Sequence, residues 1–236
     1  MTLSLARQNA YRAEYQARRP DWRPATEVYE SLIRAHLKPD ASVLDLGCGR
    51  GGVLEQLGDA VDHAFGFDPD FDSLREHRVP QLPRAVALSE HLPLRDNTID
   101  IVTCSWVLEH LEQPAQVFAE IKRVLRPGGC FIFLTPNATS LVAWMNRTLK
   151  PLQQMLVPRL YGRAESDTFP VRYRANTRSQ IIALATQTGL QCETLCQIED
   201  PTYLAFSPLL FHLSMALSRY TPPVHLVGTL RKDSNA

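Results

Sequence analysis

The chain has 236 residues, of which 44% are hydrophobic, and it carries 25 Lys and Arg residues against 25 Asp and Glu residues. This length suits one domain, or one domain with a cap, and the apolar fraction excludes an intrinsically disordered chain. A formal net charge of zero excludes a global electrostatic attraction to nucleic acid.

The cysteines and the N-terminus favour a reducing compartment. The five cysteines are odd in number and three lie in strand-like apolar segments, so we expect no disulfide framework. Cys192 and Cys196 form a CxxxC pair with no second pair and no histidine nearby, so we expect no metal site. Residues 1–19 lack the apolar core of a signal peptide, and no apolar run reaches the roughly 18 residues of a membrane span. We therefore expect a cytoplasmic protein.

The first part of the chain alternates between helices and short apolar strands. Residues 1–38 predict an N-terminal helical cap of one or two helices, of which 24–37 is the clearer. After it come predicted strands at 42–47, 61–68, 85–88, 99–105 and 130–137, with an amphipathic helix at 113–125. This alternation indicates a parallel sheet that is covered by helices on both faces.

The regular alternation ends after the fifth strand. Residues 138–175 contain no clear strand, and we interpret them as an insert. The elements expected beyond the insert are a helix over 177–190, a strand over 191–199, an apolar helical stretch over 202–218 and a last strand over 225–232.

The segment VLDLGCGRGG (43–52) joins a buried strand to a glycine-rich turn. Glycine lets the backbone approach a ligand closely, and the N–H groups of a following helix point at that ligand. The turn fits the dinucleotide pattern GxGxxG starting at Gly47, and it also fits the pattern DxGxGxG starting at Asp45. The glycines alone leave both ligands open.

Two carboxylates narrow the choice of ligand. Asp45 stands two residues before the first glycine, at the carboxyl end of the strand, where it would repel a pyrophosphate and attract an ammonium group. Asp68 ends the second strand, 21 residues after Gly47, where an acid can bind both hydroxyls of a ribose. The alternatives are that Asp45 caps the turn and that Asp68 caps the following helix.

Four segments resemble class I S-adenosylmethionine-dependent methyltransferases, specifically the type 11 methyltransferase domain. They are VLDLGCGRG, GFDPD, LPLRDNTIDIVTCSWVLEHLEQP and EIKRVLRPGGCFIFLTPN, which cover about residues 40–137. The strings VTC…VLEH and TPN are similar to those of ubiquinone-biosynthesis O-methyltransferases. The resemblance implies an α/β, Rossmann-like domain over 39–236. Its sheet would have seven strands, mostly parallel, with helices on both faces and an antiparallel last strand.

The resemblance also implies S-adenosyl-L-methionine as the cofactor. Asp45 and the backbone of Gly47 and Gly49 would then hold the methionine amino end, and Asp68 would take the ribose hydroxyls with Pro69 beside the adenine. The other implied positions are Cys48 as a turn filler, Cys104 and Ser105 facing the methionine moiety, and Ser89 and Glu90 at the adenine edge.

One position departs from the family pattern. Many members carry an acidic residue at the position of Leu88, where it reaches the adenine amino group. Ser89 and Glu90 remain for backbone contacts to the adenine edge. Glu90, His91 or a water molecule would have to supply the missing hydrogen bond.

Methyl transfer from a sulfonium is an in-line displacement with an activated leaving group, so the protein mainly aligns donor and acceptor and excludes water. A base is needed only where the acceptor must lose a proton. His110, and with less support Glu109, are the candidates after the fourth strand, although His110 could only pack or hydrogen-bond the loop. The candidate substrate contacts are Tyr15, Trp144, Arg172 and Tyr173.

The insert is expected to set specificity. Its segment 141–163 is both apolar and basic, so a substrate lid and a peripheral membrane contact through 138–163 both stay open. We expect a small acceptor, lipophilic or aromatic, that is methylated at oxygen, and no nucleic-acid partner. The alternatives are a non-catalytic cofactor-binding subunit and a methyltransferase acting on protein or RNA. The sequence predicts no oligomeric state.

Overall fold

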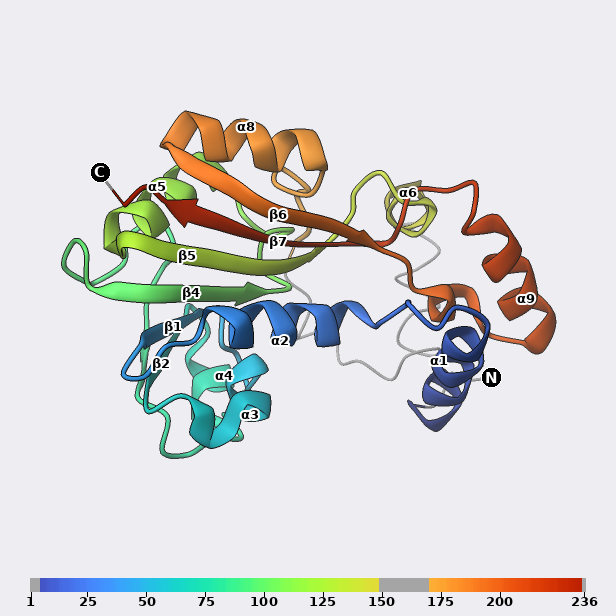
Figure 1. The fold of residues 1–236 in the computed structure, drawn as a ribbon, viewed down its shortest axis with the longest axis horizontal. Coiled ribbons are helices and arrows are strands. Elements are labelled where there is room, and N and C mark those ends of the chain that lie inside the picture. The colour runs from blue at the N-terminus through green and yellow to red at the C-terminus, as the bar shows by residue number, and fades with distance from the viewer. Residues whose placement is uncertain (1–4, 149–169, 235–236) are drawn as a thin grey trace.

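A computed structural model describes residues 5–148 and 170–234, and a seven-stranded sheet runs through its centre (Figure 1). The strands are β1 (Ser42–Leu46), β2 (His63–Asp68), β3 (Arg84–Val86), β4 (Ile99–Ser105), β5 (Leu125–Pro136), β6 (Leu190–Ile198) and β7 (His225–Lys232). Their order is β3-β2-β1-β4-β5-β7-β6, and β7 is antiparallel to both of its neighbours, whereas the other neighbours pair in parallel. This confirms the predicted Rossmann-like sheet with an antiparallel last strand.

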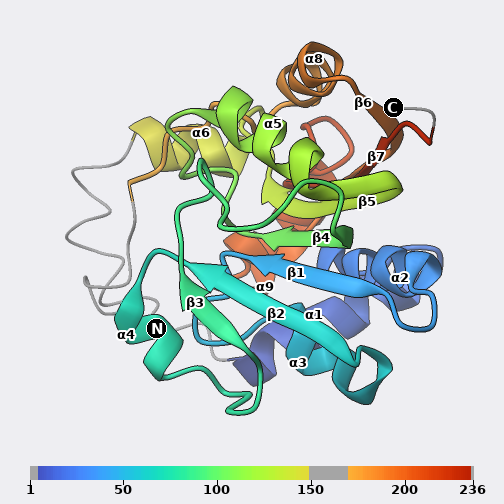
Figure 2. The same cartoon turned by 90° about the vertical axis from the view of Figure 1, so that its left-hand side faces the viewer.

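Helices lie on both faces of the sheet and beyond one of its ends (Figures 1 and 2). The described α-helices are α1 (Leu5–Arg18), α2 (Ala25–His36), α3 (Val53–Leu57), α4 (Phe71–Arg75), α5 (Pro114–Val124), α6 (Leu141–Thr148), α8 (Arg178–Thr188) and α9 (Pro208–Leu217). α5 and α8 cover one face, whereas α2 and α3 cover the other. α1, α6 and α9 gather beyond the sheet, on the right of Figure 1.

The apolar strand sequences bury both faces of the sheet. In β5, Phe131 and Phe133 point to the cluster under α5 and α8, whereas Cys130 and Ile132 point to the cluster under α2 and α3. Successive side chains of a strand point to opposite faces, so a strand between two helical layers needs a nearly continuous apolar run. This is why the runs at 99–105 and 130–137 predict central strands.

Two strands differ from the prediction at their ends. β3 stops at Val86 rather than residue 88, so Ala87 and Leu88 leave the sheet and border a cavity. β5 begins at Leu125 rather than residue 130, because Leu125 pairs with Ile99 of β4 before a register shift, and the regular pairing resumes at Cys130 opposite Ile101. The glycine at position 128 has a φ of 79°, a backbone conformation that favours glycine, and this accommodates the irregularity.

The two N-terminal helices take different places. α2 packs against β4, β5 and β7 as part of the helical layer. α1 lies apart from the sheet and packs against α9, where the rings of Tyr11 and Phe211 stack with centroids 4.4 Å apart. Of the cap expected over residues 1–38, α1 is thus the part that lies beyond the sheet (Figure 1).

The N-terminus of α8 provides a stability test. Thr177 Oγ1 accepts the Gln180 N–H at 3.1 Å, and Gln180 Oε1 accepts the Thr177 N–H at 3.1 Å, which forms a reciprocal capping box. Thr177→Ala should lower the free energy of unfolding by about 0.5–2 kcal/mol. Thr177→Ser should retain most of this stabilisation, because the serine hydroxyl can accept the same hydrogen bond. Urea unfolding of the three proteins measures this, and equal stability of the Ala and Ser variants would contradict the capping role.

Candidate functional site

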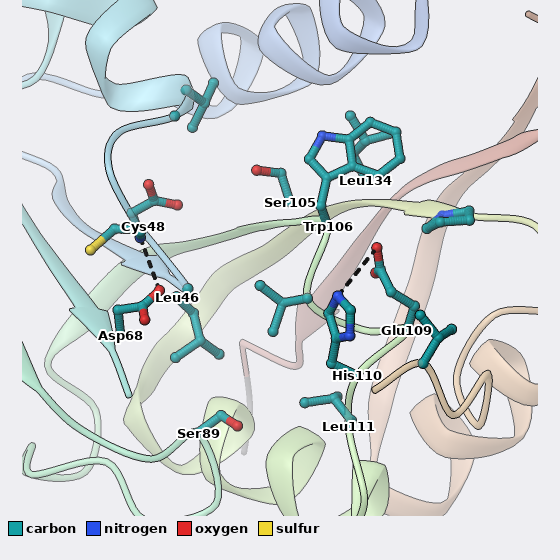
Figure 3. Close-up of a pocket in the computed structure, with 18 of the residues that line it drawn as sticks. Leu46, Cys48, Asp68, Ser89, Ser105, Trp106, Glu109, His110, Leu111 and Leu134 are labelled. Atoms are coloured by element: carbon teal, nitrogen blue, oxygen red, sulfur yellow. Dashed lines mark hydrogen bonds and ion pairs between the residues drawn. The ribbon is translucent and has the colours of Figure 1, made fainter. Parts of the chain in front are cut away.

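A cavity of about 960 Å³ opens at the carboxyl ends of β1, β2 and β4 (Figure 3). In the strand order, β2 and β3 lie on one side of β1, whereas β4 and β5 lie on the other. Open α/β sheets bind ligands at such a reversal, because the loops after the two neighbouring strands separate there. The cavity therefore stands where a parallel sheet of this order is expected to hold a ligand.

The glycine turn after β1 packs against the loop after β4. Gly47 has a φ of 76°, and a Cβ at this position would lie 2.2 Å from Cγ2 of Val107. Its N–H donates to the carbonyl oxygen of Phe67 at 2.7 Å, which ties the turn to the end of β2. Glycine is required at this position both by the backbone conformation and by the close approach of the second loop.

Asp68 is held in a fixed orientation at the cavity. Its Oδ2 accepts the Gly49 N–H at 2.9 Å, and its Oδ1 accepts the Asp70 N–H at 2.8 Å. A carboxylate oxygen has two lone-pair sites, so each oxygen keeps one for a ligand. Burial raises the pKa of Asp68, against the effect of these hydrogen bonds. The cap of α4 is Asp70, whose carboxylate accepts the Ser73 N–H, so the capping alternative for Asp68 is wrong.

Asp45 is a second buried carboxylate of the same cavity. Its residue is 3% exposed, and its Oδ1 accepts a hydrogen bond from Oγ1 of Thr103 at 2.8 Å. Burial raises the pKa of Asp45 to about 6; the Thr103 hydrogen bond opposes this rise and the charge of Asp68 adds to it. The cavity is therefore negative at its base at neutral pH. Thr103 was not among the predicted site residues, and the only sequence feature that could indicate its role is its position within the fourth strand.

The cysteines near the turn are structural. Cys48 borders the cavity, and burial, followed by the charges of Asp45 and Asp68, raises the pKa of its thiol to about 12. Its Sγ fills the space beside Gly66, where a Cβ would lie 2.5 Å from the sulfur. Cys104 is fully buried in the core under α5 and does not border the cavity, whereas the next residue, Ser105, does.

The expected adenine side of the cavity is bordered by Pro69, Leu88, Ser89 and Glu90. Leu88 is 58% exposed, so it offers an apolar surface in place of the acidic residue that many relatives carry. Ser89 Oγ donates to Oε2 of Glu90 at 3.2 Å, and Glu90 O accepts from the side-chain amide of Gln116 at 3.3 Å. These contacts fix the loop after β3 against α5.

A carboxylate–imidazole pair lies across the cavity, in the loop after β4 (Figure 3). Glu109 Oε2 accepts from Oγ1 of Thr135 at 3.2 Å, and this hydroxyl accepts from Nδ2 of Asn176 at 2.6 Å. Burial raises the pKa of Glu109 to about 7, against a backbone hydrogen bond and the Thr135 hydrogen bond. His110 Nε2 stands 3.9 Å from Glu109 Oε1.

The protonation of His110 follows from its backbone partner. His110 Nδ1 lies 3.2 Å from the carbonyl oxygen of Pro170. Because a carbonyl oxygen only accepts hydrogen bonds, Nδ1 carries the proton in the neutral ring. Nε2, the nitrogen that faces Glu109, then has a lone pair and can accept a proton.

Two aromatic residues that sequence reasoning missed complete this end of the cavity. Trp106 borders it with a φ of 59°, an unusual conformation for a bulky residue, and its ring stands edge-on to His225 at 5.2 Å. Tyr203 also borders the cavity, and its hydroxyl hydrogen-bonds Nε2 of His225 at 3.0 Å. Trp106 follows β4 directly, which is a usable signal, but Tyr203 comes from a distant 3₁₀ turn over Pro201–Leu204.

The four candidate substrate residues take different places. Tyr173 borders the cavity, and its N–H donates to Glu109 O at 3.2 Å. Tyr15 is fully buried, and its hydroxyl donates to the carboxylate of Glu199, which holds α1 to the segment after β6. Tyr15 therefore packs α1 in place and does not border the cavity.

Trp144 and Arg172 also lie off the cavity. Trp144 is 55% exposed on the outer side of α6, whereas Val142, Ala143 and Asn146 of the same helix border the cavity. Arg172 forms an ion pair with Glu112 at 2.6 Å, at the surface. Trp144 lies off the cavity because it points to the side of α6 opposite to Val142 and Ala143. Arg172 lies off the cavity because its ion-pair partner, Glu112, belongs to the loop after β4 at the surface.

The remainder of the expected lid and membrane contact falls on residues 149–169, outside the described residues. Within the described ranges, no group of three or more His, Cys, Asp or Glu residues could hold a metal ion. None of the described helices is both long enough and apolar enough to cross a membrane.

Comparison with known proteins identifies the same region. Residues 44–133 match a family model described as a methyltransferase domain. The chain is 38% identical over 184 residues to a 37.1 kDa protein in a transposon of Streptomyces fradiae, covering 74% of this chain and 51% of that protein. It is 33% identical over 102 residues to the ubiquinone biosynthesis O-methyltransferase of Aeromonas salmonicida, covering 40% of this chain and 43% of that protein. The chain thus spans about half the length of the curated relatives it matches.

The fold is also similar to a solved structure. This is the crystal structure of geranyl diphosphate C-methyltransferase from Streptomyces coelicolor A3(2), in complex with Mg²⁺, geranyl diphosphate and S-adenosyl-L-homocysteine. The TM-score is 0.60 at 14% identity, and the match covers 87% of this chain and 80% of that chain. At this identity, the likeness establishes the fold.

The structural role of Cys48 predicts its reactivity. With a pKa of about 12 and a buried sulfur, Cys48 should resist alkylation by iodoacetamide at about pH 8, whereas the exposed Cys192 should react quickly. Peptide mass spectrometry measures both rates in one sample, and unfolding in guanidinium supplies the control in which all cysteines react. Alkylation of Cys48 as fast as that of Cys192 in the native protein would contradict a turn filler.

Proposed function

Because the chain contains a methyltransferase domain of the class I S-adenosylmethionine-dependent type, we propose that it is an S-adenosylmethionine-dependent methyltransferase. We further propose a small lipophilic or aromatic acceptor, methylated at oxygen. The observation that carries the proposal is the pair of buried carboxylates, Asp45 and Asp68, beside the glycine turn of one cavity.

The residues present fit a nucleoside that carries an amino acid. A Cβ at Gly49 would project toward Asp68 Oδ2 at 3.9 Å, so the bare backbone leaves the carboxylate accessible from the turn. Asp45 and the backbone of Gly47 and Gly49 would hold the ammonium end, Asp68 the ribose hydroxyls, and Ser105 the methionine chain. A volume of about 960 Å³ is at the upper end for ligand sites, so an acceptor fits beside the donor.

S-adenosylmethionine supplies a methyl group on a sulfonium, which needs no further activation. What remains for the protein is to align the acceptor, exclude water and take a proton where the acceptor carries one. The arrangement supports His110 Nε2 as the proton acceptor. In the neutral ring Nδ1 carries the proton, so Nε2 has the lone pair, and it faces Glu109. Glu109, when ionised, would stabilise the imidazolium that this transfer forms.

The acceptor end supports an apolar or aromatic substrate. Its described wall includes the rings of Trp106, Tyr173 and Tyr203, together with Val142 and Val224. Aromatic rings give a large contact area and stack on planar ligands. The Aeromonas relative is an O-methyltransferase of ubiquinone biosynthesis, and this similarity supports oxygen as the acceptor atom.

The donor site gives a pH prediction. An ammonium group binds Asp45 only when the carboxylate is ionised, so affinity for S-adenosylhomocysteine should be flat above about pH 7 and fall as pH drops through about 6. Asp45→Asn should weaken binding about 10- to 100-fold at neutral pH and remove this step near pH 6. Calorimetric titration at several pH values measures both effects.

Asp68→Asn is the matched control for that titration. It should weaken binding at every pH, because the ribose contact is lost. The pH step should stay but move below pH 6, because the charge of Asp68 contributes to raising the pKa of Asp45. A wild-type affinity that does not change between pH 5 and 7 would show that Asp45 does not face the ammonium group.

The reaction itself is tested by label transfer. The purified protein is incubated with methyl-labelled S-adenosylmethionine and an extract of its host, which is then separated into lipid, polar, protein and RNA fractions. We expect label in the lipid fraction, and His110→Asn should reduce this label about 10²- to 10⁴-fold. His63→Asn, which changes an exposed histidine at the start of β2 and outside the cavity wall, should leave it unchanged.

The fractions also separate the alternatives. Label in the polar fraction alone would end the lipophilic acceptor, and label in protein or RNA would favour those substrates instead. Binding of S-adenosylhomocysteine without label in any fraction would favour a non-catalytic cofactor-binding subunit. A His110→Asn variant as active as wild type would remove His110 from the chemistry.

A further inference from the structure

α9 presents apolar side chains to solvent. The exposed fractions of its leucines are 78% for Leu209, 41% for Leu210, 51% for Leu213 and 39% for Leu217. Phe211 is the buried residue of the helix, and the sequence PLLFHLSMAL contains no Asp, Glu, Lys or Arg. A helix at a water surface normally turns charged residues outward. The outer face of α9 is therefore built for a less polar environment than water.

The exposed leucines form a stripe with aromatic residues beside it. Leu209, Leu213 and Leu217 are spaced by four residues, so they follow one side of the helix. Tyr220 stands just beyond the C-terminus of the helix and is 86% exposed. Trp144 of the neighbouring α6 is 55% exposed; Leu141 of α6 and Leu217 of α9 border one small cavity. Tyrosine and tryptophan favour the boundary between lipid and water.

Arginines flank the stripe. Arg219 follows the helix and is exposed, with no ion pair among the residues that the structure describes. On the α1 side, Arg18 donates to Glu14 at 2.8 Å and lies 3.4 Å from His212 of α9, while His212 lies 3.3 Å from Glu14. Two arginines thus stand against one carboxylate. Arg219 thus adds a positive charge at one end of a helix that has no charged residue of its own, and the headgroups of an anionic lipid surface would complement it.

We propose that α9 binds the surface of an anionic lipid bilayer. Its ten residues extend about 15 Å, half of the roughly 30 Å hydrocarbon thickness, so the helix lies in the interface and does not span it. The leucine stripe enters the acyl boundary, and Arg18 and Arg219 meet the lipid headgroups.

The contact places the acceptor end of the cavity next to the bilayer. Tyr203 and Val224 border both the main cavity and the small cavity beside Leu217. Figure 1 shows α9 with α1 and α6 beyond the end of the sheet, on one side of the molecule. A lipophilic acceptor would have a short path from the membrane; this consequence rests on the proposed function, whereas the bilayer contact does not.

Vesicle flotation tests the proposal on the full chain. We expect the wild type to float with vesicles of phosphatidylcholine and phosphatidylglycerol, and to float less with phosphatidylcholine alone or at high salt. The double variant Leu209→Gln, Leu213→Gln should bind these vesicles about tenfold more weakly or worse, because two apolar side chains leave the acyl boundary. Arg219→Glu should weaken binding to the anionic vesicles and leave the weak binding to phosphatidylcholine unchanged.

Phe71→Gln is the matched control, because Phe71 is 65% exposed on α4, away from α9 (Figure 2). It should float like the wild type. All variants should keep the thermal midpoint and the stabilisation by S-adenosylhomocysteine, which shows that they are folded. A wild type that stays in the soluble fraction, or a leucine double variant that floats like it, overturns the proposal. The proposal is also overturned if the wild type forms a dimer and binds no vesicles while the leucine double variant is a monomer.

Discussion

Two carboxylates buried at the ends of neighbouring parallel strands are the constraint on which the site depends. Asp45 and Asp68 are 3% and 8% exposed, and an unpaired buried charge is costly. The chain offsets this with backbone N–H groups on Asp68 and the Thr103 hydroxyl on Asp45. The Gly49 N–H reaches Asp68 from a backbone with a φ of 50°, a conformation that favours glycine, so the glycine turn and the acid depend on each other.

The opposite wall of the cavity also contains a buried carboxylate, that of Glu109. Glu109 has no cation within hydrogen-bond distance among the described residues, and a chain of Thr135 and Asn176 holds one of its oxygens. Thr135 belongs to β5 and Asn176 precedes α8, so the second half of the sheet fixes the orientation of a residue in the β4 loop. Burial then raises the pKa of Glu109 to about 7. Both the ionised and the protonated form of this carboxyl are therefore accessible near neutral pH.

The cavity lies at the carboxyl ends of the strands, and a separate group of helices lies beyond it. The proposed donor end of the cavity lies at the ends of β1 and β2, and the proposed acceptor end lies at the ends of β4 and β5 and beside the segments after β6. α1 and α9 pack beyond them (Figure 1). Tyr15 and Arg19 of the α1 region bind the carboxylate of Glu199 by a hydrogen bond and an ion pair. These contacts hold α1 against the segment that leads to Tyr203 and α9. Tyr15, which was expected to contact a substrate, instead holds α1 in place.

The sequence by itself determined the order of helices and strands along the chain and the two acids beside the glycine turn, and the family resemblance added the antiparallel last strand. These depend on neighbouring residues, namely apolar runs, glycine spacing and a family resemblance over about residues 40–137. The tertiary structure alone decided that Thr103 orients Asp45 from 58 residues away, that Trp106 and Tyr203 meet at His225, and that Tyr15 and Trp144 miss the cavity. It also decided that the apolar run in α9 faces outward. The physical reason is that local patterns fix which face of an element is apolar, whereas a hydrogen bond or an exposed face depends on what the topology brings beside it.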